Sequence, residues 1–172
     1  MDWCEAASEY YKRTWPHDSH LSVLPAEWQR ELVALMIVNN EVHNGGYLQF
    51  FANHGWEFYE YSSRALKSIG ARRLAKIVDT CQTLIDEHFP DTGQSSAERA
   101  QVLPNTIIDL NGQIIKEPGS VLPRSVLQRL SELSYEFMDY LEDLGGLAQA
   151  HYGGLIEGDK QGELGAGPNG VP

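Results

Sequence analysis

The sequence predicts a mainly α protein: a single-domain helical bundle of about six helices, with a small β-hairpin near residues 106–116. Three observations predict this fold. Apolar residues recur at helical spacing over most of the chain, and glycines and prolines interrupt these runs as loops would. The 172 residues, 42% of them hydrophobic, suffice for one core. We expect a helical domain over residues 1–157. Residues 158–172 have little to bury, so we expect a flexible tail there.

The first two helices are predicted from their ends and their apolar faces. A short helix is expected at residues 4–14, before Pro16. A second begins at Pro25, which suits the first helical position, and Glu27 meets the positive end of its dipole. Because apolar residues surround this second helix, we expect it to be buried at the centre of the bundle. Its apolar residues are Trp28, Leu32, Val33, Leu35, Met36, Ile37 and Val38.

A glycine pair marks the expected end of this central helix. The run Asn44-Gly45-Gly46 is typical of a left-handed glycine cap. Three shorter helices are then expected at residues 46–53, 56–69 and 71–88.

The second half of the chain changes character at residues 106–116, TIIDLNGQIIK. Two β-branched runs flank Asn111-Gly112, which is a strong hairpin signal, although a helix capped by Asn-Gly would show the same letters. Apolar residues at helical spacing then predict a long helix at residues 122–144 and a short helical turn at 147–152.

Composition excludes several classes of function. No apolar run approaches the roughly 20 residues of a membrane span, and the N-terminus lacks the features of a signal peptide. Cys4 and Cys81 have neither metal-site spacing nor a disulfide framework, so we expect a cytoplasmic protein. With 24 acidic against 13 basic residues, the net charge of −11 disfavours direct binding to nucleic acid and favours a basic partner.

Catalytic and metal-binding motifs are missing from the sequence. It contains no GxSxG elbow, phosphate loop, GxGxxG or HExxH. His17 and His20 are three residues apart, but they lie in an expected loop. We therefore predict no metal, no cofactor and no catalytic residue, and a protein that is not an enzyme.

Residues 39–55, NNEVHNGGYLQFFANHG, concentrate polar side chains around a glycine pair. A helix junction leaves backbone groups unpaired, and each costs about 1–3 kcal/mol when buried. We therefore assign a structural role to six residues: Glu41, Asn44, Gly45, Gly46, Gln49 and Asn53. The alternative is an enzyme or small-ligand-binding protein whose polar pocket would be formed by Glu41, His43, Asn44, Gln49 and His54.

Acidic residues form a stripe on the last predicted long helix. They are Glu132, Glu136, Asp139 and Asp143, whose spacing places them on one helical face. A solvated surface would tolerate such a stripe, but it also suits a basic protein partner. Five bases form a separate patch at residues 64–76: Arg64, Lys67, Arg72, Arg73 and Lys76.

The run EVHNGGYLQFFAN at residues 41–53, followed by Gly55 and by ALKSIGA at residues 65–71, resembles the signature of the bacterial DNA-mimic protein family. The resemblance covers residues 25–90. It implies an all-helical, often dimeric fold whose acidic surface groups, placed like DNA phosphates, occupy the DNA-binding face of a transcriptional regulator.

The acidic stripe and the resemblance together predict an acidic protein-binding module that mimics DNA, forms a homodimer and contacts its partner through Glu132, Glu136, Asp139 and Asp143. An immunity-type protein, whose acidic face binds a toxin or an enzyme, remains a third hypothesis.

Overall fold

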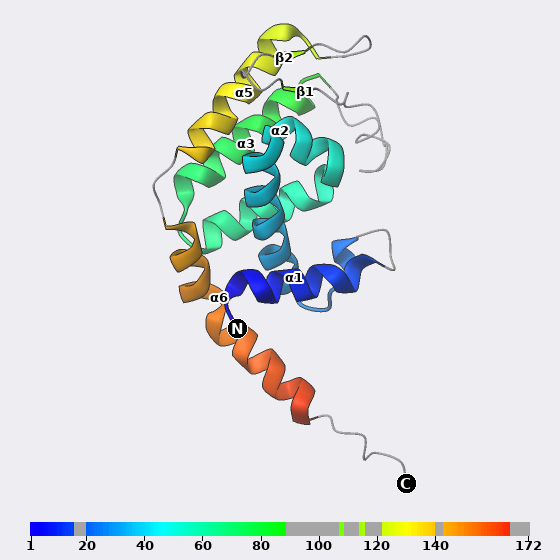
Figure 1. Cartoon of the computed structure of the whole chain (residues 1–172), viewed down its shortest axis with the longest axis vertical. Helices are drawn as coiled ribbons and strands as arrows, with labels where there is room; N and C mark the ends of the chain where they lie inside the picture. The colour runs from blue at the N-terminus through cyan, green and yellow to red at the C-terminus, as the bar shows by residue number, and fades with distance from the viewer. Residues whose placement is uncertain (16–19, 89–106, 109–113, 116–121, 140–142, 166–172) are drawn as a thin grey trace.

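The structure is a computed structural model that describes residues 1–15, 20–88, 107–108, 114–115, 122–139 and 143–165 (Figure 1). These residues contain five α-helices, one short 3-10 helix and a two-stranded sheet, so the predicted mainly α bundle is confirmed. The helices are α1 (Trp3–Thr14), η2 (Leu21–Val23), α2 (Glu27–Ser68), α3 (Arg72–Asp86), α5 (Arg124–Met138) and α6 (Leu144–Gly165).

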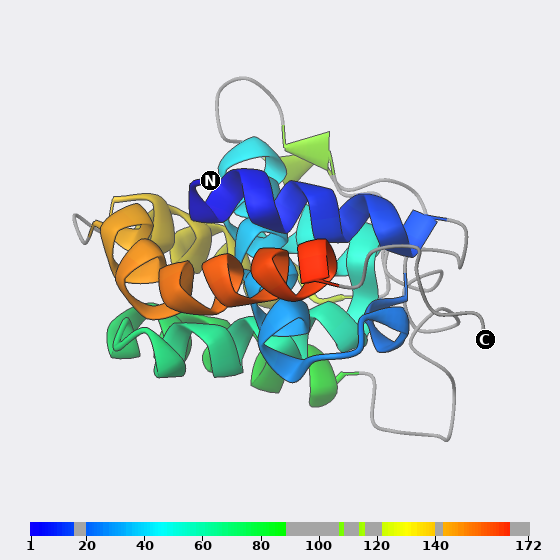
Figure 2. The same cartoon turned by 90° about the horizontal axis from the view of Figure 1, so that it is seen from below.

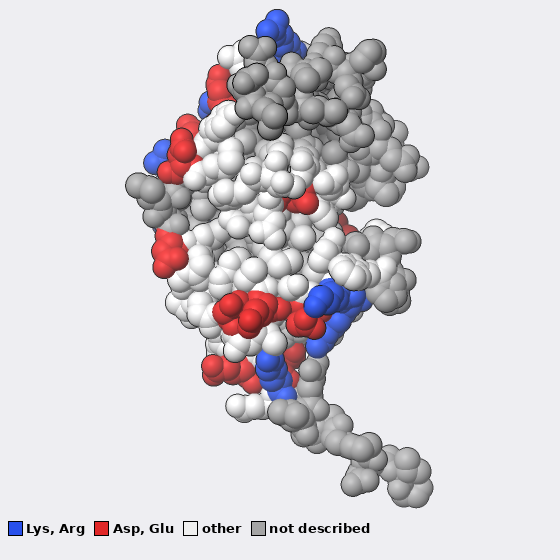
Figure 3. Space-filling view, viewed as in Figure 1, with Lys and Arg blue, Asp and Glu red and all other residues white. Residues whose placement is uncertain are grey.

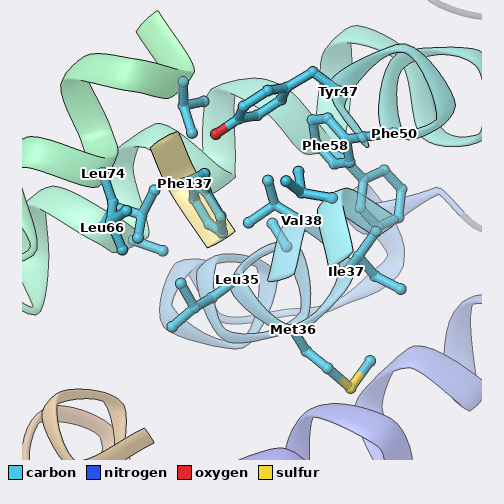
Figure 4. Packing of buried hydrophobic residues seen from close by; sticks show 14 of the residues in the cluster. Leu35, Met36, Ile37, Val38, Tyr47, Phe50, Phe58, Leu66, Leu74 and Phe137 are labelled. Carbon is cyan, nitrogen blue, oxygen red and sulfur yellow. The ribbon is translucent and has the colours of Figure 1, made fainter. Parts of the chain in front are cut away.

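Helix α2 forms the centre of the bundle, as predicted. It packs against α1, α3, α5 and α6, and α1 and α3 lie on opposite sides of it (Figure 2). Every residue from Leu32 to Val38 is buried, which requires neighbours all round the helix. Figure 4 shows the side chains of Leu35, Met36, Ile37 and Val38 pointing in different directions from the helix. None of the described helices is long and apolar enough to span a membrane.

A sharp bend interrupts α2 where the sequence predicts its end. Gly46 has a φ of 75°, so the expected left-handed glycine is present. The helix does not stop there, however: α2 changes direction and continues to Ser68 (Figure 1). The segments expected as separate helices at 46–53 and 56–69 are therefore both parts of α2, apart from Ile69, its C-cap residue. The prediction was wrong because a left-handed glycine can redirect a helix as well as end one, if neighbours pair the freed backbone groups.

The predicted hairpin is confirmed. Strands β1 (Ile107–Ile108) and β2 (Ile114–Ile115) pair antiparallel, with Ile107 opposite Ile115 and Ile108 opposite Ile114. The Asn-Gly pair expected to form its turn lies outside the described residues.

The predicted long helix at 122–144 is two elements. Helix α5 ends at Met138, with Asp139 as its C-cap residue, and α6 starts at Leu144. The side chain of Asp143 accepts a hydrogen bond of 2.9 Å from the backbone N–H of Gly146, in the first turn of α6. A short polar residue that pairs such an N–H favours the start of a new helix, and Asp143 has this role at α6.

The expected tail at residues 158–172 is corrected over 158–165, and residues 166–172 lie outside the described residues. Helix α6 includes the predicted turn at 147–152 and continues to Gly165. Its Asp159 accepts hydrogen bonds from the hydroxyl of Tyr10 (2.7 Å) and the amide of Gln29 (3.3 Å). These contacts tie residues 158–165 to α1 and α2. Composition could not indicate them, because both partners are distant in the sequence.

Candidate functional site

Four polar side chains meet across the bend of α2, and we call them the bend cluster: Glu41, Gln49, Asn53 and His54. One carboxylate oxygen of Glu41 accepts hydrogen bonds from Gln49 (2.9 Å) and Asn53 (2.8 Å). Its other oxygen lies 3.3 Å from Nε2 of His54. Because Glu41 precedes Gly46 and its three partners follow it, the carboxylate links the two arms of the helix.

His54 lies in an aromatic environment within this cluster. Its side chain is 11% exposed, and its ring centroid lies 4.9 Å from that of Phe58 and 6.2 Å from that of Tyr11. Burial lowers the pKa of His54, and the neighbouring Glu41 only partly opposes this effect. The ring is therefore neutral at neutral pH, and Nε2 donates its proton toward the Glu41 carboxylate.

The two glycines at the bend have different roles. A Cβ atom at Gly45 would overlap the side chain of Gln49, so Gly45 makes room for the bend cluster. Gly46 supplies the left-handed backbone, which glycine adopts without steric cost. In the sequence pattern NGG, the first glycine is therefore needed for space and the second for its backbone conformation.

Ser134 of α5 completes the bend, and the sequence analysis did not identify it. Its hydroxyl accepts a hydrogen bond of 3.0 Å from the backbone N–H of Tyr47 and donates one of 2.8 Å to the carbonyl of Leu130. The N–H that the bend frees is thereby paired. One feature of the sequence could have identified Ser134: it is a serine on the apolar face of its helix, between Leu130 and Phe137, and a buried hydroxyl there needs hydrogen-bond partners.

The alternative polar pocket is assembled only in part. Glu41, Gln49 and His54 meet, whereas His43 and Asn44 are exposed. Nδ1 of His43 lies 2.8 Å from the carbonyl oxygen of Asn39 and away from the bend cluster. Both oxygens of Glu41 already have partners, an arrangement that favours the structural role. Within the described ranges, no three His, Cys, Asp or Glu side chains are grouped as metal ligands would be.

The four acids of the predicted stripe are exposed, but they do not share one helix. Glu132 and Glu136 lie in α5, Asp139 is its C-cap residue, and Asp143 precedes α6 and pairs with its first turn, so the single-helix prediction was wrong. The stripe also has a base beside it. Glu132 pairs with Arg129 at 3.1 Å, three residues earlier.

The basic patch at residues 64–76 is partly neutralised within the fold. Lys67 pairs with Asp79 at 2.9 Å. Arg64 pairs with three acids of α2: Glu27, Glu31 and Glu60. The patch therefore contributes less positive surface than its composition suggests.

Charged residues are unevenly distributed over the surface. Acidic side chains lie along the edge formed by α5 and over α1 and α6, and a broad area between them has few charges (Figure 3). Helices α3 and α5 pack side by side and run in opposite directions, so the acidic end of α5 lies beside the start of α3, with Arg72 and Arg73 (Figure 1). These bases limit the acidic surface on that side.

Comparison with known proteins identifies the family. The family model described as DMP19-like protein matches residues 23–156, a region that contains the bend and the acidic end of α5. Neither the curated proteins nor the solved structures gave a match. The matched region spans most of the 172 residues. The chain therefore belongs to the DMP19-like family, which is a family of DNA-mimic proteins.

Proposed function

We propose that this chain is a non-enzymatic, acidic protein-binding module that mimics DNA and occupies the DNA-binding surface of a basic protein, such as a transcriptional regulator. Membership of the DMP19-like family over residues 23–156 is the observation that carries the proposal. The net charge of −11 supports it, because a surface that binds phosphates through Lys and Arg also attracts a protein of this charge.

We propose the acidic end of α5 and the start of α6 as the binding surface, with Glu132, Glu136, Asp139 and Asp143. The charges of α5 oppose its dipole: Arg124 is its first residue, and Glu136 lies in a last turn without a base. An acid at a helix C-terminus typically costs about 0.3–1 kcal/mol. The stability of α5 therefore does not explain Glu136 and Asp139, which supports a role in binding.

The spacing of these acids favours a dimer as the functional unit. A rise of about 1.5 Å per residue separates Glu132 from Glu136 by about 6 Å along α5. A DNA strand presents one phosphate per roughly 3.4 Å of axis. A single row is therefore sparser than one DNA strand, and a second copy of the chain would add another row. We include a homodimer in the proposal for this reason.

Two charge reversals test the proposed surface. Glu136→Lys combined with Asp139→Lys should abolish capture of the basic partner when the purified protein is used as bait in a cell lysate, at low salt. Capture by the unaltered protein should be sensitive to salt, and duplex DNA should displace the captured protein. The matched control reverses the exposed Glu60 and Glu87, which gives the same net charge, and it should retain capture.

The outcomes separate mimicry from general charge attraction. Equal loss of capture in both double variants would show that only net charge matters. A captured protein that binds the chain and DNA simultaneously would contradict mimicry, because the two should compete for one surface.

A further inference from the structure

An exposed aromatic residue lies within the proposed binding surface. The side chain of Tyr135 is 48% exposed, although a tyrosine usually buries much of its ring. On a helix, residues three before and four after a position are its surface neighbours, and for Tyr135 these are Glu132 and Asp139. The ring is thus flanked by a carboxylate on each side along α5.

We propose that Tyr135 anchors the partner in this surface by receiving an arginine side chain, whose guanidinium lies over the ring and donates hydrogen bonds to the carboxylate of Asp139. This inference rests on the proposed function and specifies the chemistry of the partner: an arginine from a surface that otherwise contacts DNA. Tyr135 is a specificity residue in this proposal, and the acids provide the general attraction.

Arginine suits this position better than lysine does. Its planar guanidinium stacks on aromatic rings and pairs with carboxylates through the same fork of N–H groups that it offers to phosphates. A DNA-binding arginine that leaves its phosphate would therefore find an equivalent acceptor at Asp139 and an additional surface at the ring. Lysine pairs as a point charge and gains less from the ring.

The same combination of groups already binds an arginine elsewhere in this molecule. The guanidinium of Arg64 lies over the ring of Tyr61, with 5.4 Å between its carbon and the ring centroid, and pairs with Glu60 at 3.7 Å. In that arrangement the arginine comes from the chain itself, and Glu27 and Glu31 also pair with it. Tyr135 and Asp139 present the same two kinds of side chain at the end of α5, four residues apart rather than adjacent.

The neighbours of Tyr135 leave one carboxylate open. Glu132 is held by Arg129 at 3.1 Å and by the amide of Gln128 at 3.2 Å. The side chain of Asp139 is exposed and has no hydrogen-bond or ion-pair partner within the described part of the chain, although its backbone N–H donates to the carbonyl of Tyr135. Its side chain is thus free to accept from a partner, which is why we place the guanidinium on this side of the ring.

Two basic peptides of equal length, oligoarginine and oligolysine, test the inference directly. Binding is followed by fluorescence anisotropy of the labelled peptides at low salt. The unaltered protein should bind oligoarginine more tightly by roughly two- to fivefold, the expected effect of an exposed cation–π contact. Tyr135→Leu should reduce this preference to what carboxylate pairing alone provides, without weakening oligolysine binding, and Tyr135→Phe should keep it in full.

The control uses a second exposed aromatic residue. Trp15 is 61% exposed and follows α1, so Trp15→Leu should leave the arginine preference unchanged. A preference that is undiminished in Tyr135→Leu, or is missing from the unaltered protein, would overturn the role of Tyr135. The proposed function would survive that result if Glu136→Lys with Asp139→Lys still abolished partner capture. Failure of the proposed function would appear separately, as undiminished partner capture by the Glu136→Lys, Asp139→Lys variant.

Discussion

The bend cluster and the acidic end of α5 both contain carboxylates, but the fold uses them in opposite ways. At the bend, the side chain of Glu41 is 17% exposed and has three partners. At the end of α5, Glu136 and Asp139 are exposed, and no such partner exists for either within the described residues. The recognisable sequence signature therefore encodes the bend, whereas the proposed function depends on surface acids that the signature does not include.

The largest expected effect in this comparison comes from removing the carboxylate at the bend. Glu41→Ala should lower the free energy of unfolding by about 2–4 kcal/mol, because the partly buried Gln49 and His54 lose their shared partner, as does the exposed Asn53. Urea denaturation followed by circular dichroism measures this change. A loss below about 1 kcal/mol would show that water replaces the carboxylate, and the bend cluster would then need another explanation.

A methyl group at Gly46 should have an intermediate effect. Gly46→Ala should destabilise the protein by about 1–2 kcal/mol, because residues with a Cβ atom rarely adopt its φ of 75°. Gly154→Ala in α6 is the matched control, since a Cβ there meets no neighbour within 4 Å. That change should stabilise the helix by about 0.5–1 kcal/mol. Thermal unfolding of both variants compares them, and equal shifts would exclude a conformational role for Gly46.

The same contrast explains how much the sequence could reveal. The buried central helix, the left-handed glycine and the hairpin all follow from local patterns, and the structure confirms each of them. Continuation of α2 beyond Gly46 depends on Ser134, which is 87 residues from its partner Tyr47. The helical segment at 158–165 likewise depends on Asp159 meeting α1 and α2. Such distant contacts leave no periodic pattern in the sequence.

The acidic stripe shows a different limit of pattern reading. Its spacing suggested one helix, because charge periodicity carries no information about where a helix ends. Asp143 fits the periodicity but caps the next helix instead. Short polar residues serve equally well on a helix face and at an N-cap position, so their role is decided by the local backbone.

The smallest expected effect concerns stability at the acidic end of α5. Glu136→Lys with Asp139→Lys should change the free energy of unfolding by less than about 0.5 kcal/mol, although it should abolish partner capture. The sign should be stabilising, because bases replace acids at the negative end of the helix dipole.

The bases at the start of α3 act against this gain, so Arg72→Gln in the same background should increase it. Urea denaturation at low and high salt measures both effects, since screening should reduce them. A loss above about 1 kcal/mol would mean that these acids support the fold, as Glu41 does, and the two regions would no longer differ.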